Sequence, residues 1–131
     1  MIQNEAIRQE IVALLQGKVQ GVAHFHNGRT TFTDLDNELP ALSVFIDEAE
    51  YQPIAACGEE CDAYLKIGIY LPMFATENVL DEIAEQVANI LRDASFKTVD
   101  ECTLRKYSYD YDATDSAWKN STLHFSINYI N

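Results

Sequence analysis

The part of the sequence most able to do chemistry is a short acidic run near its end. Asp110, Asp112 and Asp115 lie within six positions, and carboxylate oxygens are the ligands that Mg²⁺ and Ca²⁺ prefer. The run lacks the central glycine and final glutamate of an EF-hand loop, and no histidine adjoins it as an acid–base partner. Solvated carboxylates are therefore the first interpretation, a dedicated metal site is a weak candidate, and catalysis is a weaker one.

A second set of residues could bind zinc through nitrogen and sulfur. His24 and His26 are two positions apart and would point to one face of a strand, while Cys57 and Cys61 form a C-x₃-C pair. This spacing is looser than C-x₂-C, and the polar residues between the cysteines favour an exposed loop over a zinc site. Cys102 stands apart from these residues and is interpreted as a small buried apolar side chain.

A ladder of aromatic residues is the third candidate. Tyr107, Tyr109 and Tyr111 alternate along one predicted strand, so their side chains share one face of a sheet. They either pack in the core against helices or form a contact with another protein, because tyrosine joins a large apolar ring to a hydroxyl group that tolerates water. The interface candidates on the second interpretation are Tyr107, Tyr109, Tyr111, Trp118, Tyr64 and Tyr70.

Composition and charge narrow the class of protein. The 131 residues are enough for one domain with its own core, and 47% of them are hydrophobic. The net charge of −12 disfavours direct nucleic-acid binding, because an acidic surface repels phosphate. No apolar run approaches the roughly 20 residues of a membrane span. The first residues lack a signal-peptide pattern, so a cytoplasmic protein with reduced thiols is expected.

The hydrophobic pattern predicts the elements that position these residues. Helices are predicted at 4–16 and 77–93. Strands are predicted at 22–25, 30–32, 39–46, 63–71, 103–112 and 121–130. The first two strands should form a hairpin around Asn27-Gly28, a pair suited to a type I′ turn, and 47–62 should be a polar connection. Thr76 is the expected N-cap of the second helix.

Together these elements predict one α+β domain over residues 1–131. Its sheet is mainly antiparallel or mixed, with about five to six strands, and the two α-helices pack on one face. Two helices do not cover both faces of such a sheet, so the other face is solvated or used for binding. Along strand 63–71, Leu65 and Ile67 should face the core, whereas Tyr64 and Tyr70 should face the opposite side.

The order of these elements resembles that of the minor tail protein U family of long-tailed phages, the tail terminators of lambda-like viruses. The resemblance covers essentially the whole chain. It is carried by "NGR" at 27–29, "LPALSVFIDEAEY" at 39–51, "YLP" at 70–72 and a closing "YDYDATDSAW" followed by "LHFSINY". The segments "IAACGEEC" and "RDASFKTVDEC" depart most from the pattern, which leaves the specificity of the loops open.

The resemblance implies a structural protein without an active site. Members of the family cap the growing tail tube as a six-membered ring, end its polymerisation and offer the surface that joins the head. The implied partners are further copies of the chain, the tail tube protein and a head–tail joining protein, with DNA passing through the ring. The implied location is the bacterial cytoplasm during assembly and then the virion tail, and a prophage is the expected source.

Two alternatives stay open from the residues alone. A small metal-dependent hydrolase would use Asp110, Asp112 and Asp115, or the histidine and cysteine set, and would hold metal tightly in a deep pocket. A prophage remnant would keep the fold and lack its tail partners. On the terminator interpretation no cofactor is expected, and Mg²⁺ or another divalent cation promotes ring assembly by screening the acidic charge.

Overall fold

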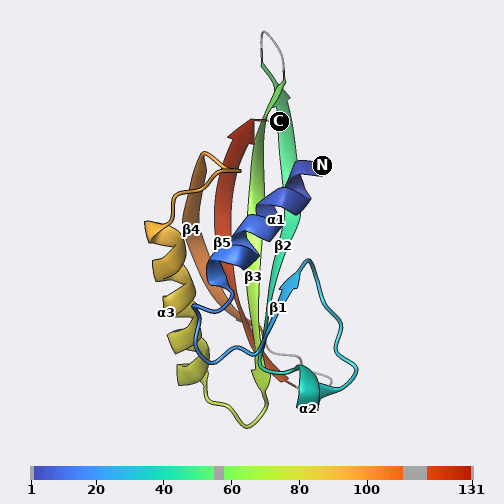
Figure 1. Ribbon diagram of the computed structural model, residues 1–131, viewed down its shortest axis with the longest axis vertical. Helices are drawn as coiled ribbons and strands as arrows, with labels where there is room; N and C mark the ends of the chain where they lie inside the picture. The colour runs from blue at the N-terminus through green and yellow to red at the C-terminus, as the bar shows by residue number, and fades with distance from the viewer. Residues whose placement is uncertain (1, 55–57, 111–117, 131) are drawn as a thin grey trace.

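The computed structural model describes residues 2–54, 58–110 and 118–130 and confirms the α+β class (Figure 1). Its helices are α1 (Ile2–Leu15), α2 (Leu35–Glu38) and α3 (Glu77–Asp93). Its strands are β1 (His24–Asn27), β2 (Ala41–Pro53), β3 (Glu59–Pro72), β4 (Glu101–Asp110) and β5 (Trp118–Ile130). The strands form a five-stranded mixed sheet in the order β1-β2-β3-β5-β4.

The sheet is organised around β3, whose alternating pattern buries one side. Ile67 is fully buried and lies between Val44 of β2 and Leu123 of β5, with antiparallel pairing on both sides. Leu65 and Ile69 are also fully buried on this side. The predicted core face of strand 63–71 is therefore confirmed, and the ends of this strand extend further than predicted.

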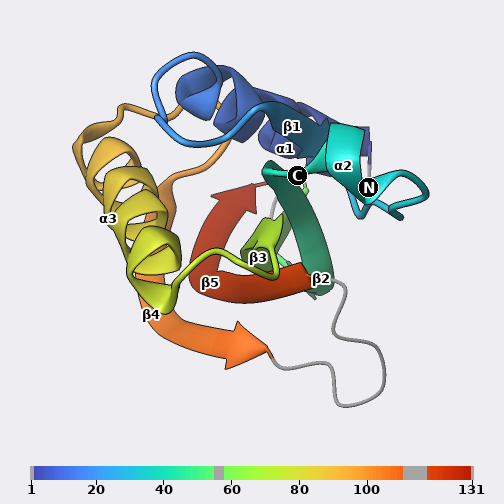
Figure 2. The same cartoon turned by 90° about the horizontal axis from the view of Figure 1, so that it is seen from below.

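Helices α1 and α3 cover the same face of the sheet, as predicted (Figures 1 and 2). The apolar stripe of α3 recurs at helical spacing, so Leu80, Ile83, Val87 and Leu91 are buried against the strands. Thr76 occupies the N-cap position of α3, but its hydroxyl makes no capping hydrogen bond. The face opposite α1 and α3 is called the open face below.

One carboxylate ties α1 to the segment that enters β4. Glu10 accepts hydrogen bonds from the backbone N–H groups of Lys97 at 2.7 Å and Thr98 at 3.1 Å, and from the Thr98 hydroxyl. Burial disfavours the charged carboxylate, but these donors outweigh burial and lower the pKa of Glu10. The contact therefore joins the first helix to a segment more than eighty residues later.

The predicted hairpin around Asn27-Gly28 is wrong. β1 pairs with β2 in parallel, with His26 opposite Ser43, and residues 30–32 form no strand. Gly28 has a φ of 102°, whereas Asn27 does not adopt a positive φ, so the pair is not a type I′ turn. The chain leaves the sheet at Gly28 and passes through α2 before it returns as β2.

The predicted polar connection at 47–62 is also wrong. Its residues continue β2 and β3 as one long hairpin, paired from Glu48 opposite Tyr64 to Pro53 opposite Glu59. The end of this hairpin, called the arm below (residues 48–53 and 59–62), projects beyond the helices (Figure 1). The inward-facing Ala49 and Tyr51 do alternate with acidic residues. Asp and Glu are depleted in strands, which favoured the interpretation as a connection.

Candidate partner-binding surface

The predicted tyrosine ladder lies on the helix side of the sheet. The rings of Tyr107 and Tyr109 meet edge to face, 5.0 Å apart, and both hydroxyls donate to the Asp81 carboxylate of α3, at 3.1 and 2.5 Å. Burial, together with the Asp81 carboxylate, raises the pKa of Tyr107. Tyr107 packs against the core, so of these two tyrosines only Tyr109, which is 39% exposed, offers much area to a partner. Tyr111 lies outside the described residues.

Tyr70 and Trp118 lie together on the open face, at the end of the sheet away from the arm. The Phe32 ring meets both edge to face, with its centroid 5.1 Å from that of Tyr70 and 5.4 Å from that of Trp118. These rings border a shallow depression of about 650 Å³, which Arg29 and Asp110 also line. The sequence did not indicate this cluster, because Phe32 reaches it from the connection between β1 and α2.

The middle of the open face carries a row of basic residues. Lys66 of β3 lies directly opposite His124 of β5, which lies opposite Lys106 of β4. A register shift in β4 just before Lys106 also turns Arg105 to this face, where its Nε donates to the Ser126 hydroxyl at 2.8 Å. Lys66, Arg105, Lys106 and His124 are called the basic row below.

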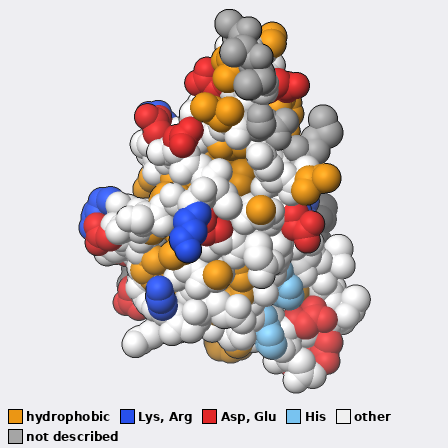
Figure 3. All heavy atoms as spheres, turned by 45° about the horizontal axis from the view of Figure 1, so that its top comes forward, with side chains coloured by type: hydrophobic (Ala, Val, Ile, Leu, Met, Phe, Trp, Pro, Cys, Tyr) orange, Lys and Arg blue, Asp and Glu red, His pale blue; other side chains and the backbone are white. Residues whose placement is uncertain are grey.

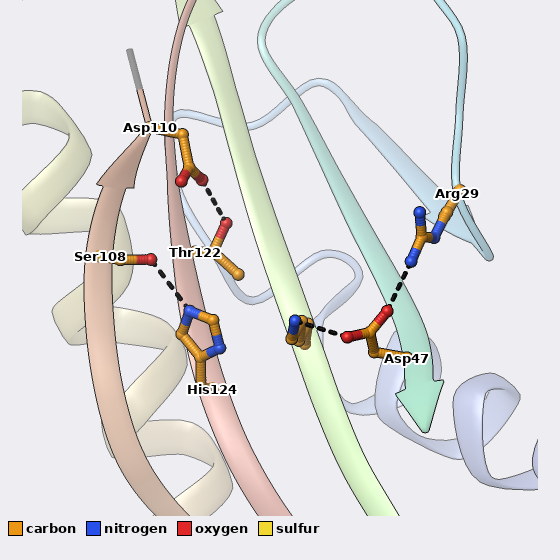
Figure 4. Close-up of polar contacts among 7 residues, drawn as sticks. Arg29, Asp47, Ser108, Asp110, Thr122 and His124 are labelled. Carbon is orange, nitrogen blue, oxygen red and sulfur yellow. Dashed lines mark hydrogen bonds and ion pairs between the residues drawn. The ribbon is translucent and has the colours of Figure 1, made fainter. Parts of the chain in front are cut away.

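His124 is the central member of the basic row. Its Nε2 lies 2.9 Å from the Ser108 hydroxyl (Figure 4). Burial, followed by the positive charges of Lys66 and Lys106, lowers the pKa of His124. The imidazole is therefore neutral at pH 7, and the charge of the row comes from its lysines and its arginine.

One carboxylate balances part of that charge (Figure 4). Asp47 accepts hydrogen bonds from Lys66 Nζ at 2.8 Å and from the Arg29 guanidinium at 2.7 Å. The hydrogen bond and charge of Lys66 hold the pKa of Asp47 below its usual value. Arg29 also lies over the Phe45 ring, 4.9 Å from its centroid. Exposed ion pairs stabilise a fold only slightly, so this network mainly orients the side chains.

Asp110 is the only member of the predicted acidic run within the described residues. Its carboxylate accepts hydrogen bonds from the Thr122 hydroxyl at 2.8 Å and the Asn120 amide at 3.2 Å (Figure 4 shows the first of these). Asp112 and Asp115 fall outside those residues, so the acidic run as a metal site stays a prediction. In residues 2–54, 58–110 and 118–130, no three His, Cys, Asp or Glu side chains gather closely enough to hold a metal ion.

The structure separates the predicted zinc ligands. Cys61 is fully buried on the helix side of the arm, whereas His24 and His26 lie on the open-face side near the other end of the sheet. A single zinc site that combines His24, His26 and Cys61 is therefore ruled out. Cys57 lies outside the described residues. Cys102, predicted to be buried, is partly buried and packs against the core, and this burial raises the pKa of its thiol to about 12.

Sequence reasoning missed an apolar patch at the end of the molecule opposite the arm. Phe74 is 89% exposed just after β3, and Met73 and Val79 beside it are exposed as well. These side chains border a hollow of about 610 Å³ that Leu35 and Pro40 also line. The signal in the sequence was the apolar pair Met73-Phe74 in a connection between elements, where polar residues are usual.

Two comparisons with known proteins bear on these surfaces. Residues 2–129 match the family described as phage minor tail protein U. The tail tube terminator protein of Escherichia phage N15 is 28% identical over 131 residues, a match that spans 94% of this chain and 95% of the N15 protein. The family match therefore includes the arm, the basic row and the apolar patch. Among the described residues, no helix has the length and apolar character needed to cross a membrane.

Proposed function

The chain belongs to the phage minor tail protein U family, and from this premise we propose that it is a tail terminator. It forms a six-membered ring that caps the tail tube, ends tube polymerisation and provides the surface that joins the head. The observation that carries this proposal is the family match over residues 2–129. The N15 relative, a tail tube terminator, supports the same assignment.

A ring subunit needs two different surfaces for its neighbours and another for the tube, because a closed ring is built from head-to-tail contacts. Three exposed surfaces of this chain are available for these contacts. The first is the open face, and the second is the apolar patch around Phe74. The third is a groove of about 300 Å³ between α3 and β4, lined by Ala84, Ala88 and Leu104.

Several polar groups of the open face are held in place by their neighbours, as a partner-binding surface requires. Ser108 contacts His124, Thr122 donates to Asp110, and Lys66 donates to Asp47. Each of these three groups is thus paired with a neighbour on the same face. Such pairing holds side chains in fixed positions, which suits a surface that must match a partner.

Net charge controls assembly in this proposal. Six copies of a chain with a net charge of −12 carry −72 in total. This charge opposes ring closure at low ionic strength, and salt or Mg²⁺ relieves the repulsion by screening. The ring assembles in the bacterial cytoplasm, binds the tail tube protein and a head–tail joining protein, and becomes part of the virion tail. DNA passes through its lumen without sequence-specific binding.

Light scattering and a capping assay test the proposal. The mass of the purified chain is measured at low salt and again with added Mg²⁺, and a monomer that shifts to about six subunits is expected. The chain is then added to polymerising tail tube protein, and tube length is measured by electron microscopy. Tubes should stop growing and carry the chain at one end.

Two results would overturn the proposal. A chain that stays monomeric in every condition and leaves tube length unchanged is not a terminator. A monomer that retains stoichiometric metal and hydrolyses a substrate would instead support the metal-dependent hydrolase. Dialysis followed by metal analysis separates these two outcomes.

A further inference from the structure

The arm is the most acidic part of the described chain. Its acidic residues are Glu48, Glu50, Glu59, Glu60 and Asp62, and the sequence has no Lys or Arg between positions 47 and 66. In the view of Figure 3, acidic side chains flank the projecting end of the molecule. The arm therefore carries an uncompensated negative charge away from the body of the protein.

The basic row lies on the same sheet but belongs to the body. The chain has nine Lys and Arg residues in all, and three of them belong to the row. Lys66 is already balanced by Asp47, whereas Arg105 and Lys106 form no ion pair with any residue that the structure describes. Both side chains are exposed. Within the basic row, Arg105 and Lys106 are thus the positive charges available to a partner.

The arm places two like charges opposite each other, and the basic row gathers positive charge on β3 and β4, on either side of β5. Glu50 lies directly opposite Asp62 across the arm, and Lys66 and Lys106 flank the same residue of β5. Like charges placed opposite each other on neighbouring strands destabilise a sheet. A ligand of opposite charge relieves this repulsion, and each surface offers what the other lacks.

The arm adjoins the basic row of its own chain only at its base, where Glu48 lies opposite Tyr64, and its outer part lies further away. Both lie on β3, since Asp62 belongs to the arm and Lys66 to the row. Four residues of extended strand separate them by about 13 Å. A continuous strand does not fold back on itself, so Glu50 and Asp62 meet a complementary surface only on another molecule.

We propose that the open face of the arm in one copy docks on the basic row of the next copy. Glu48 and Glu50 of the arm then face Arg105 and Lys106 across the contact. Tyr64, which is 50% exposed and lies opposite Glu48 within each chain, adds apolar area beside the charges. In the ring each copy engages its arm with one neighbour and its row with another, whereas a two-fold pair that joins both contacts between the same two copies would give a dimer in light scattering; this inference rests on the proposed ring.

Charge-reversal variants test the docking directly. The arm variant is Glu48→Lys with Glu50→Lys, and it raises the net charge from −12 to −8. The row variant is Arg105→Glu with Lys106→Glu, and it lowers the net charge to −16. Each variant is measured alone by light scattering, in the salt and Mg²⁺ at which the wild-type chain assembles. Each should need a protein concentration at least tenfold higher than the wild type to assemble.

Mixing provides the decisive measurement. In an equal mixture, the positive arm of the first variant meets the negative row of the second, and the unchanged arm and row also match. An alternating ring therefore has only complementary contacts, and the mixture should recover assembly. A chain that carries all four substitutions should recover it as well. Melting curves by circular dichroism establish that each variant is folded.

The matched control separates docking from general repulsion. Glu5→Lys with Glu82→Lys also gives −8, but both residues are exposed on the helices. If only net charge mattered, the arm variant and this control would both assemble better than the wild type. The docking instead requires the arm variant to assemble worse and the control to assemble at least as well.

The possible outcomes distinguish this inference from the proposed function. A wild type that forms rings, together with arm and row variants that form them equally well, refutes the docking and leaves the terminator proposal intact. Folded variants that lose assembly but do not recover on mixing also refute the docking. A wild type that never associates refutes both.

Discussion

Removal of the Glu10 carboxylate should loosen the tie between α1 and the segment that enters β4. Glu10 accepts hydrogen bonds from the backbone N–H groups of Lys97 and Thr98 and from the Thr98 hydroxyl. Hydrogen bonds to a charged group contribute about 1.5–3 kcal/mol each when buried. The site is only partly buried, so hydrogen bonds to water replace part of the lost stabilisation. Glu10→Ala should therefore lower the free energy of unfolding by about 2 kcal/mol.

The pH dependence of this effect follows from the lowered pKa of Glu10. A carboxyl group whose pKa is lower in the folded state contributes stability above its unfolded pKa and loses it as pH falls through the folded value. The difference between the wild type and Glu10→Ala should therefore be constant from about pH 7 to pH 5 and shrink at lower pH. Glu10→Gln, which keeps the shape but not the charge, should fall between the two.

Urea unfolding at pH 7, 5 and 3, followed by circular dichroism, measures these differences. Glu5→Ala is the matched control, because Glu5 is an exposed glutamate of the same helix, and it should change stability by less than about 0.5 kcal/mol. A Glu10→Ala effect as large at pH 3 as at pH 7 would show that lost packing, rather than the charged hydrogen bonds, is responsible. No effect at pH 7 would refute the reasoning altogether.

Three further predictions concern other parts of the structure. Gly68→Ala should destabilise the fold by about 1–3 kcal/mol in urea unfolding, because a Cβ there would lie 2.7 Å from the Tyr70 hydroxyl oxygen and 3.0 Å from its ring; unchanged stability would mean that the Tyr70 ring moves freely. The Cys102 thiol, with its pKa raised to about 12, should react with iodoacetamide at pH 8 roughly a thousandfold more slowly than a free thiol. Rapid labelling at this position in the native protein, located by mass spectrometry, would contradict the burial. Tyr107→Phe should lower the stability measured by thermal unfolding by about 1 kcal/mol, because the hydrogen bond to Asp81 is lost. A stability equal to that of the wild type would mean that only the ring of Tyr107, and not its hydroxyl, stabilises the fold.

The sequence predicted well those elements in which the spacing of nearby apolar residues shows which side is buried. α3 shows its stripe through Leu80, Ile83 and Val87, and β3 shows its core face through Leu65 and Ile67. In both cases, one side of the element meets the core over its whole length. The pattern of a few neighbouring residues therefore suffices to place the element and its buried face.

The features that the sequence did not reveal depend on distant partners. Asn27-Gly28 has the residues of a tight hairpin turn, but the parallel pairing of β1 with β2 outweighs that local preference. Simple alternation would place Arg105 on the helix side with Tyr107 and Tyr109. The register shift in β4 turns Arg105 to the open face instead, and no local pattern announces such a shift. The basic row was therefore not readable from the sequence.

Because of the strand order, the sheet is complete only once β5, the last strand of the sequence, is in place. β5 lies between β3 and β4, so β4 reaches the sheet only through β5. While a ribosome is still making residues 118–130, Arg105 and Lys106 have no fixed position beside Lys66. A chain truncated before β5 thus presents no basic row, and under the proposed docking it would be excluded from the ring. If the proposed docking holds, the topology lets only fully synthesised chains enter the assembly.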